Sequence, residues 1–179
     1  MKKLVHPATP FLAVVCAFLL GFAGLPGQAT ARIGHMPKDG VARQQLRPFN
    51  GNSVSLSSLR GQVVVLDFFA TWCGHSRLHV PTVRRLADDE GPRGTQVIGL
   101  AVEERDSTVQ QFIKDQHITY PVATVSDPVF GGFVESRDVS VPQTLVYGRD
   151  GRLAGHFVGH SAEQDAELVA TVKRELDKH

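Results

Sequence analysis

Residues 63–76 read VVVLDFFATWCGHS, and this stretch decides the fold class of the 179-residue chain. Its first seven residues are almost all β-branched or aromatic, a composition typical of a strand buried on both faces of a parallel sheet. After Cys73 the spacing of apolar residues changes to that of a helix. We therefore expect a buried strand over residues 63–69, followed by a helix that continues to about Asp89.

This predicted helix has its own internal pattern. Leu78, Val83 and Leu86, with charged residues interleaved between them, indicate the helix. Pro81 lies inside the helix and is expected to bend it, because proline removes one backbone hydrogen bond.

The rest of the chain alternates between strand and helix patterns. Asn50-Gly51 and Asp150-Gly151 predict hairpin turns, and Ser161 with Gln164 predicts the start of a last helix. Strands are expected over residues 53–56, 63–69, 96–102, 144–147 and 152–158, and helices over residues 74–89, 106–116 and 161–176. Residues 127–132 are expected to be irregular or helical. This order predicts an α/β fold with a central mixed sheet and helices on both of its faces.

Composition excludes several classes of protein. Hydrophobic residues make up 42% and charged residues 21%, which is ordinary for a globular domain. A formal net charge of +1 argues against a nucleic-acid partner recognised through bulk charge. No apolar run reaches the roughly 18 residues that a membrane span needs.

The start of the chain has the pattern of an export signal. Lys2 and Lys3 precede an apolar run over residues 11–22, and Ala29-Thr30-Ala31 supplies small residues at a cleavage site. We expect cleavage after Ala31 and export, most consistent with the periplasm. The alternative is an uncleaved membrane anchor.

The predicted organisation is therefore a signal peptide over residues 1–31, a flexible lead-in over 32–45 and one domain over 46–179. Cys16 belongs to the signal segment, so cleavage would leave Cys73 as the single cysteine. A lone thiol in an exported protein is a reactive group or an intermolecular partner, since it cannot close an internal disulfide.

Cys73 is expected at the start of a helix. Backbone N–H groups at a helix N-terminus point toward any anion placed there, and a thiolate is such an anion. The position is therefore expected to lower the pKa of the Cys73 thiol, which favours the nucleophilic form.

These residues carry a resemblance to a known family. Residues 65–76, with Pro81 eight positions after Cys73, resemble the thioredoxin family, and residues 141–145 resemble its cis-proline loop. Residues 50–61 resemble the exported TlpA/ResA-like branch. The resemblance covers about residues 46–176, and it implies a thioredoxin-like fold and thiol–disulfide exchange on disulfide- or thiol-bearing proteins.

One departure from the family falls at its reactive motif. The family motif is Trp-Cys-x-x-Cys, but Ser76 stands here at the position of the second, resolving cysteine. A hydroxyl cannot release a mixed disulfide, although it can donate a hydrogen bond to the Cys73 thiolate. The predicted chemistry is therefore attack by Cys73, formation of a mixed disulfide, and release by a substrate thiol, a small thiol or a membrane thiol reductant.

The resemblance implies roles for further residues. Trp72 corresponds to the aromatic residue beside the family's site, and His75 is expected to favour the thiolate when protonated. Asp67 corresponds to a buried acid that handles protons in the family, and its burial is expected to raise its pKa. Val141 and Pro142 are expected to bind an extended substrate segment, with Pro142 preceded by a cis bond.

A metal centre is a competing interpretation of the same region. Cys73, His75 and His79 are all residue types that bind copper or zinc, and His156 and His160 offer more imidazoles. Cys73 would point away from His75 on a regular helix, so no metal and no cofactor are predicted. His79 also replaces a glutamate that the TlpA/ResA-like branch has near its thiols.

Other functions fit the residues around Cys73 less well than thiol exchange does. A one-cysteine peroxiredoxin carries Thr three residues before its cysteine, whereas Thr71 stands two before Cys73. Nothing in the sequence supports Cys-His hydrolysis. The main alternative is a non-catalytic thioredoxin-fold module that binds client segments between Trp72 and Pro142.

Overall fold

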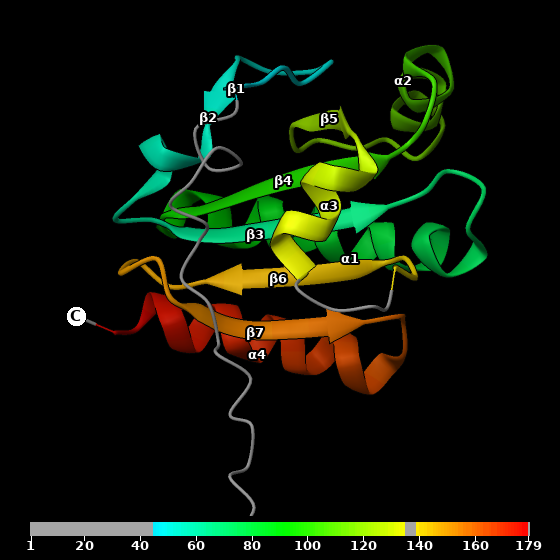
Figure 1. Ribbon diagram of the computed structural model, residues 1–179. Coiled ribbons are helices and arrows are strands. Elements are labelled where there is room, and N and C mark those ends of the chain that lie inside the picture. Colours follow the sequence, from blue (N-terminus) through cyan, green and yellow to red (C-terminus); the bar gives the residue numbers. More distant parts are fainter. Residues whose placement is uncertain (1–44, 135–138, 179) are drawn as a thin grey trace, which may run out of the picture. The chain divides into compact units, whose positions relative to one another are not determined.

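The computed structural model describes residues 45–134 and 139–178 (Figure 1). The predicted signal peptide and almost all of the predicted lead-in lie outside the described residues. Within the described residues, no helix combines the length and the apolar character that crossing a membrane requires.

A five-stranded mixed sheet lies at the centre of the described chain, in the order β5-β4-β3-β6-β7. The central strand β3 runs parallel to β4 and antiparallel to β6, as Figure 1 shows. Every residue of β3 is buried, which explains its almost uninterrupted apolar sequence. The strands are β3 (Val63–Phe69), β4 (Thr95–Val102), β5 (Val122–Val125), β6 (Gln143–Tyr147) and β7 (Leu153–Val158).

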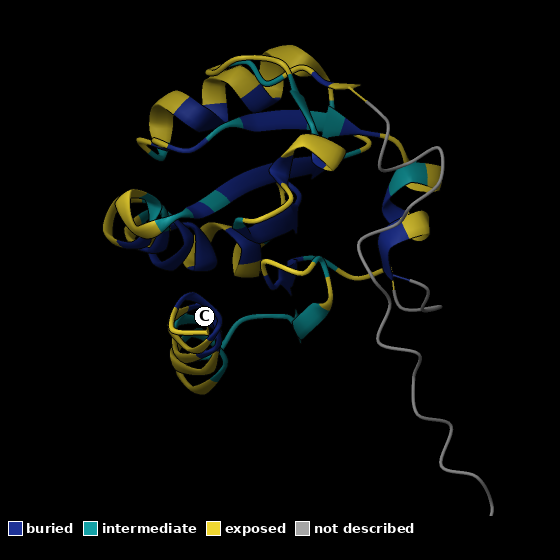
Figure 2. Cartoon of the chain, turned by 90° about the vertical axis from the view of Figure 1, so that its left-hand side faces the viewer, coloured by how far each residue is buried: buried dark blue, intermediate teal, exposed yellow. Residues whose placement is uncertain are grey.

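Helices cover both faces of this sheet, as predicted. The apolar residues of β3 with odd numbers contribute to a cluster with α1, α2 and α4, and those with even numbers to a cluster with α3. Figure 2 shows the consequence, since the central strands are buried and the outer sides of the helices are exposed. The helices are α1 (Gly74–Glu90), α2 (Asp106–Asp115), α3 (Asp127–Val134) and α4 (Ala162–Leu176).

Most predicted elements are confirmed within a residue or two. The predicted cap of the last helix is present, because the Ser161 hydroxyl accepts a hydrogen bond from the Gln164 amide at 3.2 Å. The predicted turn between β6 and β7 is also present, with Gly151 at φ 77°. The predicted strand over residues 53–56 is shorter, because only β2 (Val54–Ser55) is extended and a 3₁₀ turn, η1 (Leu56–Leu59), follows it.

Asn50 acts differently from the prediction of a tight hairpin turn. Two-residue β1 (Gln45–Leu46) pairs with β2 across a longer loop that contains Asn50. The Asn50 amide group donates to the Tyr120 carbonyl at 2.8 Å and accepts from the Val122 amide at 2.9 Å. The side chain thus ties the loop to β5, a strand that the sequence analysis missed.

The inward face of α1 includes a histidine. Leu78 is 63% exposed, whereas Val83 and Leu86 are buried. The neighbouring His79 is 3% exposed and occupies the core position instead, beside Val80. The helix is therefore turned so that an imidazole, rather than a leucine, lies under the sheet.

Candidate functional site

Cys73 lies where β3 ends and α1 begins. Its amide donates to the Ala70 carbonyl and its carbonyl accepts from the Arg77 amide, both at 3.1 Å. Cys73 is half-buried and is the N-cap of the 17-residue helix α1, although its side chain makes no hydrogen bond with the first amides of the helix. These amides have no acceptor within the helix and favour an anion at this position.

The sulfur contacts a loop from a distant part of the chain. Cys73 Sγ donates to the Val141 carbonyl at 3.2 Å, and the Val141–Pro142 peptide bond is cis, as the resemblance implied. Pro142 itself is buried, whereas Val141 is half-buried. Of this predicted pair, Val141 is the residue whose carbonyl oxygen faces the Cys73 sulfur.

An open cleft of about 470 Å³ adjoins the sulfur. Trp72 and Val139 both line it, and they are 76% and 70% exposed. Phe130 and Val141 add apolar surface, while Glu103 contributes a carboxylate. Two large exposed apolar side chains beside a thiol are the features of a binding surface rather than of an inert face.

Glu104 fixes the turn that leads into the cysteine. Its carboxylate accepts from both the amide and the hydroxyl of Thr71, at 2.5 and 2.6 Å. The Thr71 hydroxyl is therefore engaged with Glu104. The sequence analysis missed Glu104. A usable signal was present, because Glu104 lies just beyond the end of β4, and the carboxyl ends of the parallel strands β3 and β4 lie at the same edge of the sheet.

Two predicted supporting residues do not contact the sulfur. Ser76 is buried, and its hydroxyl accepts from the Ala70 amide at 3.4 Å. His75 is exposed and makes no side-chain hydrogen bond or ion pair with another described residue. Among the described contacts, neither side chain is bonded to Cys73, so their predicted support of the thiolate remains a proposal.

Asp67 is buried in the middle of β3. Burial raises the pKa of its carboxyl group, an effect that the His79 charge and a hydrogen bond from Thr144 partly offset. The Thr144 hydroxyl donates to Asp67 Oδ1 at 3.1 Å. The elevated pKa agrees with the expectation from the sequence, but no described contact joins Asp67 to Cys73.

His79 is bonded to acidic and hydroxyl groups instead of the thiol. Its Nδ1 lies 2.9 Å from Asp165 Oδ1, and its Nε2 lies 3.0 Å from Thr144 Oγ1 and 3.7 Å from Asp67 Oδ1. The structure therefore does not bring together Cys73, His75 and His79, the candidate metal ligands considered in the sequence analysis. Thr144 and Asp165 escaped the sequence analysis because neither belongs to a recognisable motif.

The remaining histidines differ from each other. His156 is exposed on β7, and its Nε2 lies 2.8 Å from Gln143 Oε1. His160 is half-buried and lies against His79, with the two ring centroids 5.9 Å apart. His156 thus lies on the surface, and His160 lies in the connection between β7 and α4.

A mixed sheet with α1 and α4 on one face and α3 on the other, and a cysteine facing a cis-proline loop, define a thioredoxin-fold thiol protein. The chain belongs to the AhpC/TSA family, whose profile matches residues 37–156.

Curated relatives give a more specific comparison. The thiol-disulfide oxidoreductase ResA of Oceanobacillus iheyensis is 29% identical over 91 residues, which is 51% of this chain and 47% of that protein. A thioredoxin-like protein of Haemophilus influenzae is 32% identical over 112 residues, 60% of this chain and 62% of that protein. The chain thus spans about half to two thirds of the length of these relatives.

Solved structures show the same fold. A candidate protein disulfide isomerase from Bacteroides thetaiotaomicron superposes with a TM-score of 0.72 at 28% identity, over 82% of this chain and 91% of that one. A thiol:disulfide interchange protein from Chlorobium tepidum superposes with a TM-score of 0.63 at 29% identity, over 75% and 98% of the two chains.

Proposed function

We propose that this protein is exported and catalyses thiol–disulfide exchange, with Cys73 as its single nucleophile. The Cys73 thiolate attacks one sulfur of a substrate disulfide, forms a mixed disulfide and releases the other sulfur as a thiolate. A thiol of the same substrate, or a small thiol, then attacks the mixed disulfide and restores the Cys73 thiolate. When the substrate supplies that thiol, the cycle isomerises disulfides without net oxidation or reduction.

The observation that carries this proposal is the position of the sulfur. Cys73 lies at the start of α1, at the edge of an apolar cleft, and Ser76 occupies the place of a resolving cysteine. The relatives are thiol-disulfide oxidoreductases, which supports the class of reaction. A peroxidase is less well supported. Thr71 is the threonine near the thiol that such a site would use, and its hydroxyl donates to Glu104 instead.

The cleft indicates the kind of substrate. Trp72, Phe130, Val139 and Val141 offer apolar contact, and such side chains suit the exposed apolar segments of an incompletely folded protein. We propose that these segments bind across Trp72 and Val141, which places a client disulfide beside the Cys73 sulfur.

A second candidate function is a client-binding module without turnover. It is favoured by the same cleft together with Ser76, since a mixed disulfide that this chain cannot release by itself would trap the client. The two functions differ in whether the covalent complex breaks down when thiols are present.

Refolding of scrambled ribonuclease with glutathione present, in EDTA, separates these functions. The unaltered protein should accelerate recovery of activity in substoichiometric amounts, and Cys73→Ser should abolish the acceleration. Leu78→Ala is the matched control, because it changes an exposed side chain of the same helix and leaves the thiol in place. Equal recovery with the unaltered protein and with Cys73→Ser would reject catalysis.

Restoring the missing thiol provides a second test. Ser76→Cys should create reduction of insulin disulfides with a dithiol as electron donor, because a second thiol can then release the mixed disulfide. Absence of this gain in a folded Ser76→Cys protein would show that the site does not hold the two sulfurs in exchange geometry.

A further inference from the structure

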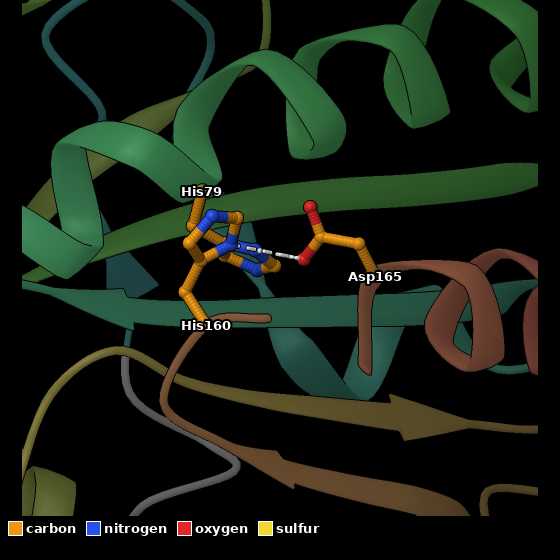
Figure 3. A group of neighbouring side chains, drawn as sticks. All are labelled: His79, His160 and Asp165. Atoms are coloured by element: carbon orange, nitrogen blue, oxygen red, sulfur yellow. Dashed lines mark hydrogen bonds and ion pairs between the residues drawn. The ribbon is translucent and has the colours of Figure 1, made fainter. Parts of the chain in front are cut away.

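Three metal-binding side chains converge away from the thiol, on the face of the sheet covered by α1 and α4. They are His79 of α1, His160 of the connection after β7, and Asp165 of the first turns of α4 (Figure 3). We propose that they form a binding site for a divalent transition-metal ion, with Zn²⁺ as its occupant. The site is independent of the exchange chemistry proposed for Cys73.

The distances between the three side chains suit a single ion. Asp165 Oδ1 lies 2.9 Å from His79 Nδ1 and 3.3 Å from His160 Nδ1, and all three ligand atoms lie within 4.8 Å of one another. Zn²⁺ with ligands at about 2.0–2.1 Å in tetrahedral geometry separates neighbouring ligand atoms by roughly 3.3 Å. Two of the three separations are therefore already close to those around a bound ion.

Hydrogen bonds orient the His79 ring toward this point. Thr144 has one hydroxyl proton and donates it to Asp67 Oδ1, so the Thr144 oxygen is left to accept from Nε2–H of His79. The other ring nitrogen, Nδ1, faces Asp165 Oδ1 at 2.9 Å. A metal ion bound here would replace the proton of this hydrogen bond.

The surroundings hold the ligands in place. Metal-binding imidazoles ordinarily donate their second nitrogen to an oxygen, and metal-binding carboxylates are themselves hydrogen-bonded. Here Thr144 and Asp67 orient His79, while the Thr82 hydroxyl donates to Asp165 Oδ2. The Asp165 carboxylate also brings an anionic oxygen to the ligand set, as a divalent cation requires.

An ion can reach this point from solvent. An open groove of about 570 Å³ runs between α1 and α4, and Thr82 and Asp165 lie in its wall. His160 is only half-buried. Three protein ligands with an open side leave the fourth position of a tetrahedral Zn²⁺ to water, as in sites that bind a further molecule.

Calorimetric titration of the full chain with zinc chloride tests the proposal. We expect one ion to be bound with a micromolar or tighter dissociation constant, and the affinity to fall about 100-fold or more in His160→Ala and Asp165→Asn, which each remove a ligand. His156→Ala and Cys73→Ser are the controls, and each should leave this affinity unchanged. Both ligand variants alter partly exposed positions, and circular dichroism checks that they fold.

Cobalt provides a second readout that weak surface binding does not give. Co²⁺ in the unaltered protein should produce the intense visible bands of a tetrahedral centre, and these bands should disappear in the two ligand variants. The proposal is overturned if the unaltered protein binds Zn²⁺ no more tightly than His160→Ala and Asp165→Asn, or if Cys73→Ser removes the binding. Because refolding is assayed in EDTA, failure here leaves the proposed exchange function intact.

Discussion

Cys73 receives its surroundings from two parts of the chain that are far apart in sequence. Cys73 is the N-cap of α1, and a residue 68 positions later supplies the Val141 carbonyl, which lies 3.2 Å from the sulfur. The residue type and its helix-start position are local properties of the sequence. The opposing carbonyl is a property of the folded chain.

Glu104 is expected to control the placement of Cys73 without touching it. Glu104→Ala removes both hydrogen bonds to Thr71 and leaves its amide without this acceptor, so we expect a loss of about 1–3 kcal/mol in the free energy of unfolding. We also expect slower alkylation of Cys73 by iodoacetamide, because the turn before the cysteine loosens. Urea denaturation and alkylation rates measure the two effects.

The conservative variant Glu104→Gln provides the control. Its amide oxygen still accepts from Thr71, so it should recover part of the lost stability. A Glu104→Ala protein with unchanged stability and unchanged Cys73 reactivity would contradict this positioning role.

At the scale of elements, the close packing of β4 against β5 depends on Gly99 of β4. A Cβ atom on Gly99 would lie 2.9 Å from Tyr120 Cε2 and 3.0 Å from Val122 Cγ2, both in the core. Gly99→Ala should therefore destabilise the protein by about 1–3 kcal/mol through overpacking, as measured by urea denaturation.

Gly131 of α3 offers a matched glycine with open space. A Cβ atom there would meet nothing within 4 Å, so Gly131→Ala should be neutral or stabilise by about 0.5–1 kcal/mol through helix propensity. If both alanine substitutions change the free energy of unfolding equally, the side chains around Gly99 do not exclude a Cβ atom, and the overpacking explanation fails.

The elements also show which sequence patterns are reliable. The β3 strand was predicted to the residue, because a long apolar run needs a fully buried environment wherever it lies. The four-residue β5 was missed, since so short a segment has no distinct period. Its position follows from pairing with β4 and from the hydrogen bonds of Asn50, which no local pattern indicates.

Asp67 links the stability of the whole molecule to pH. Burial raises the pKa of Asp67 above its ordinary value of 3.8, so the folded protein keeps this proton at pH values where the unfolded chain has lost it. The contribution of this group to stability therefore falls as the pH rises above about 4. Asp67→Asn removes the dependence, and its amide oxygen can still accept from Thr144.

We expect Asp67→Asn to be the more stable protein at pH 7, by an amount of the order of 1 kcal/mol, and the difference to shrink toward pH 4. Urea denaturation between pH 4 and 8, with EDTA present to exclude bound metal, measures this. A constant difference between the two proteins across that range would show that the burial of the carboxylate is not its cause.

From the sequence came the class of fold, the cysteine at a helix start, and the serine in place of a second thiol. These features follow from residue type and short-range period, which depend on neighbours along the chain. Only the tertiary structure decided that Glu104 holds Thr71, and that His79 turns inward to meet an aspartate 86 residues away. The packing of helices on the sheet sets these contacts. It joins residues that are far apart in sequence, and no local pattern in the sequence indicates such pairs.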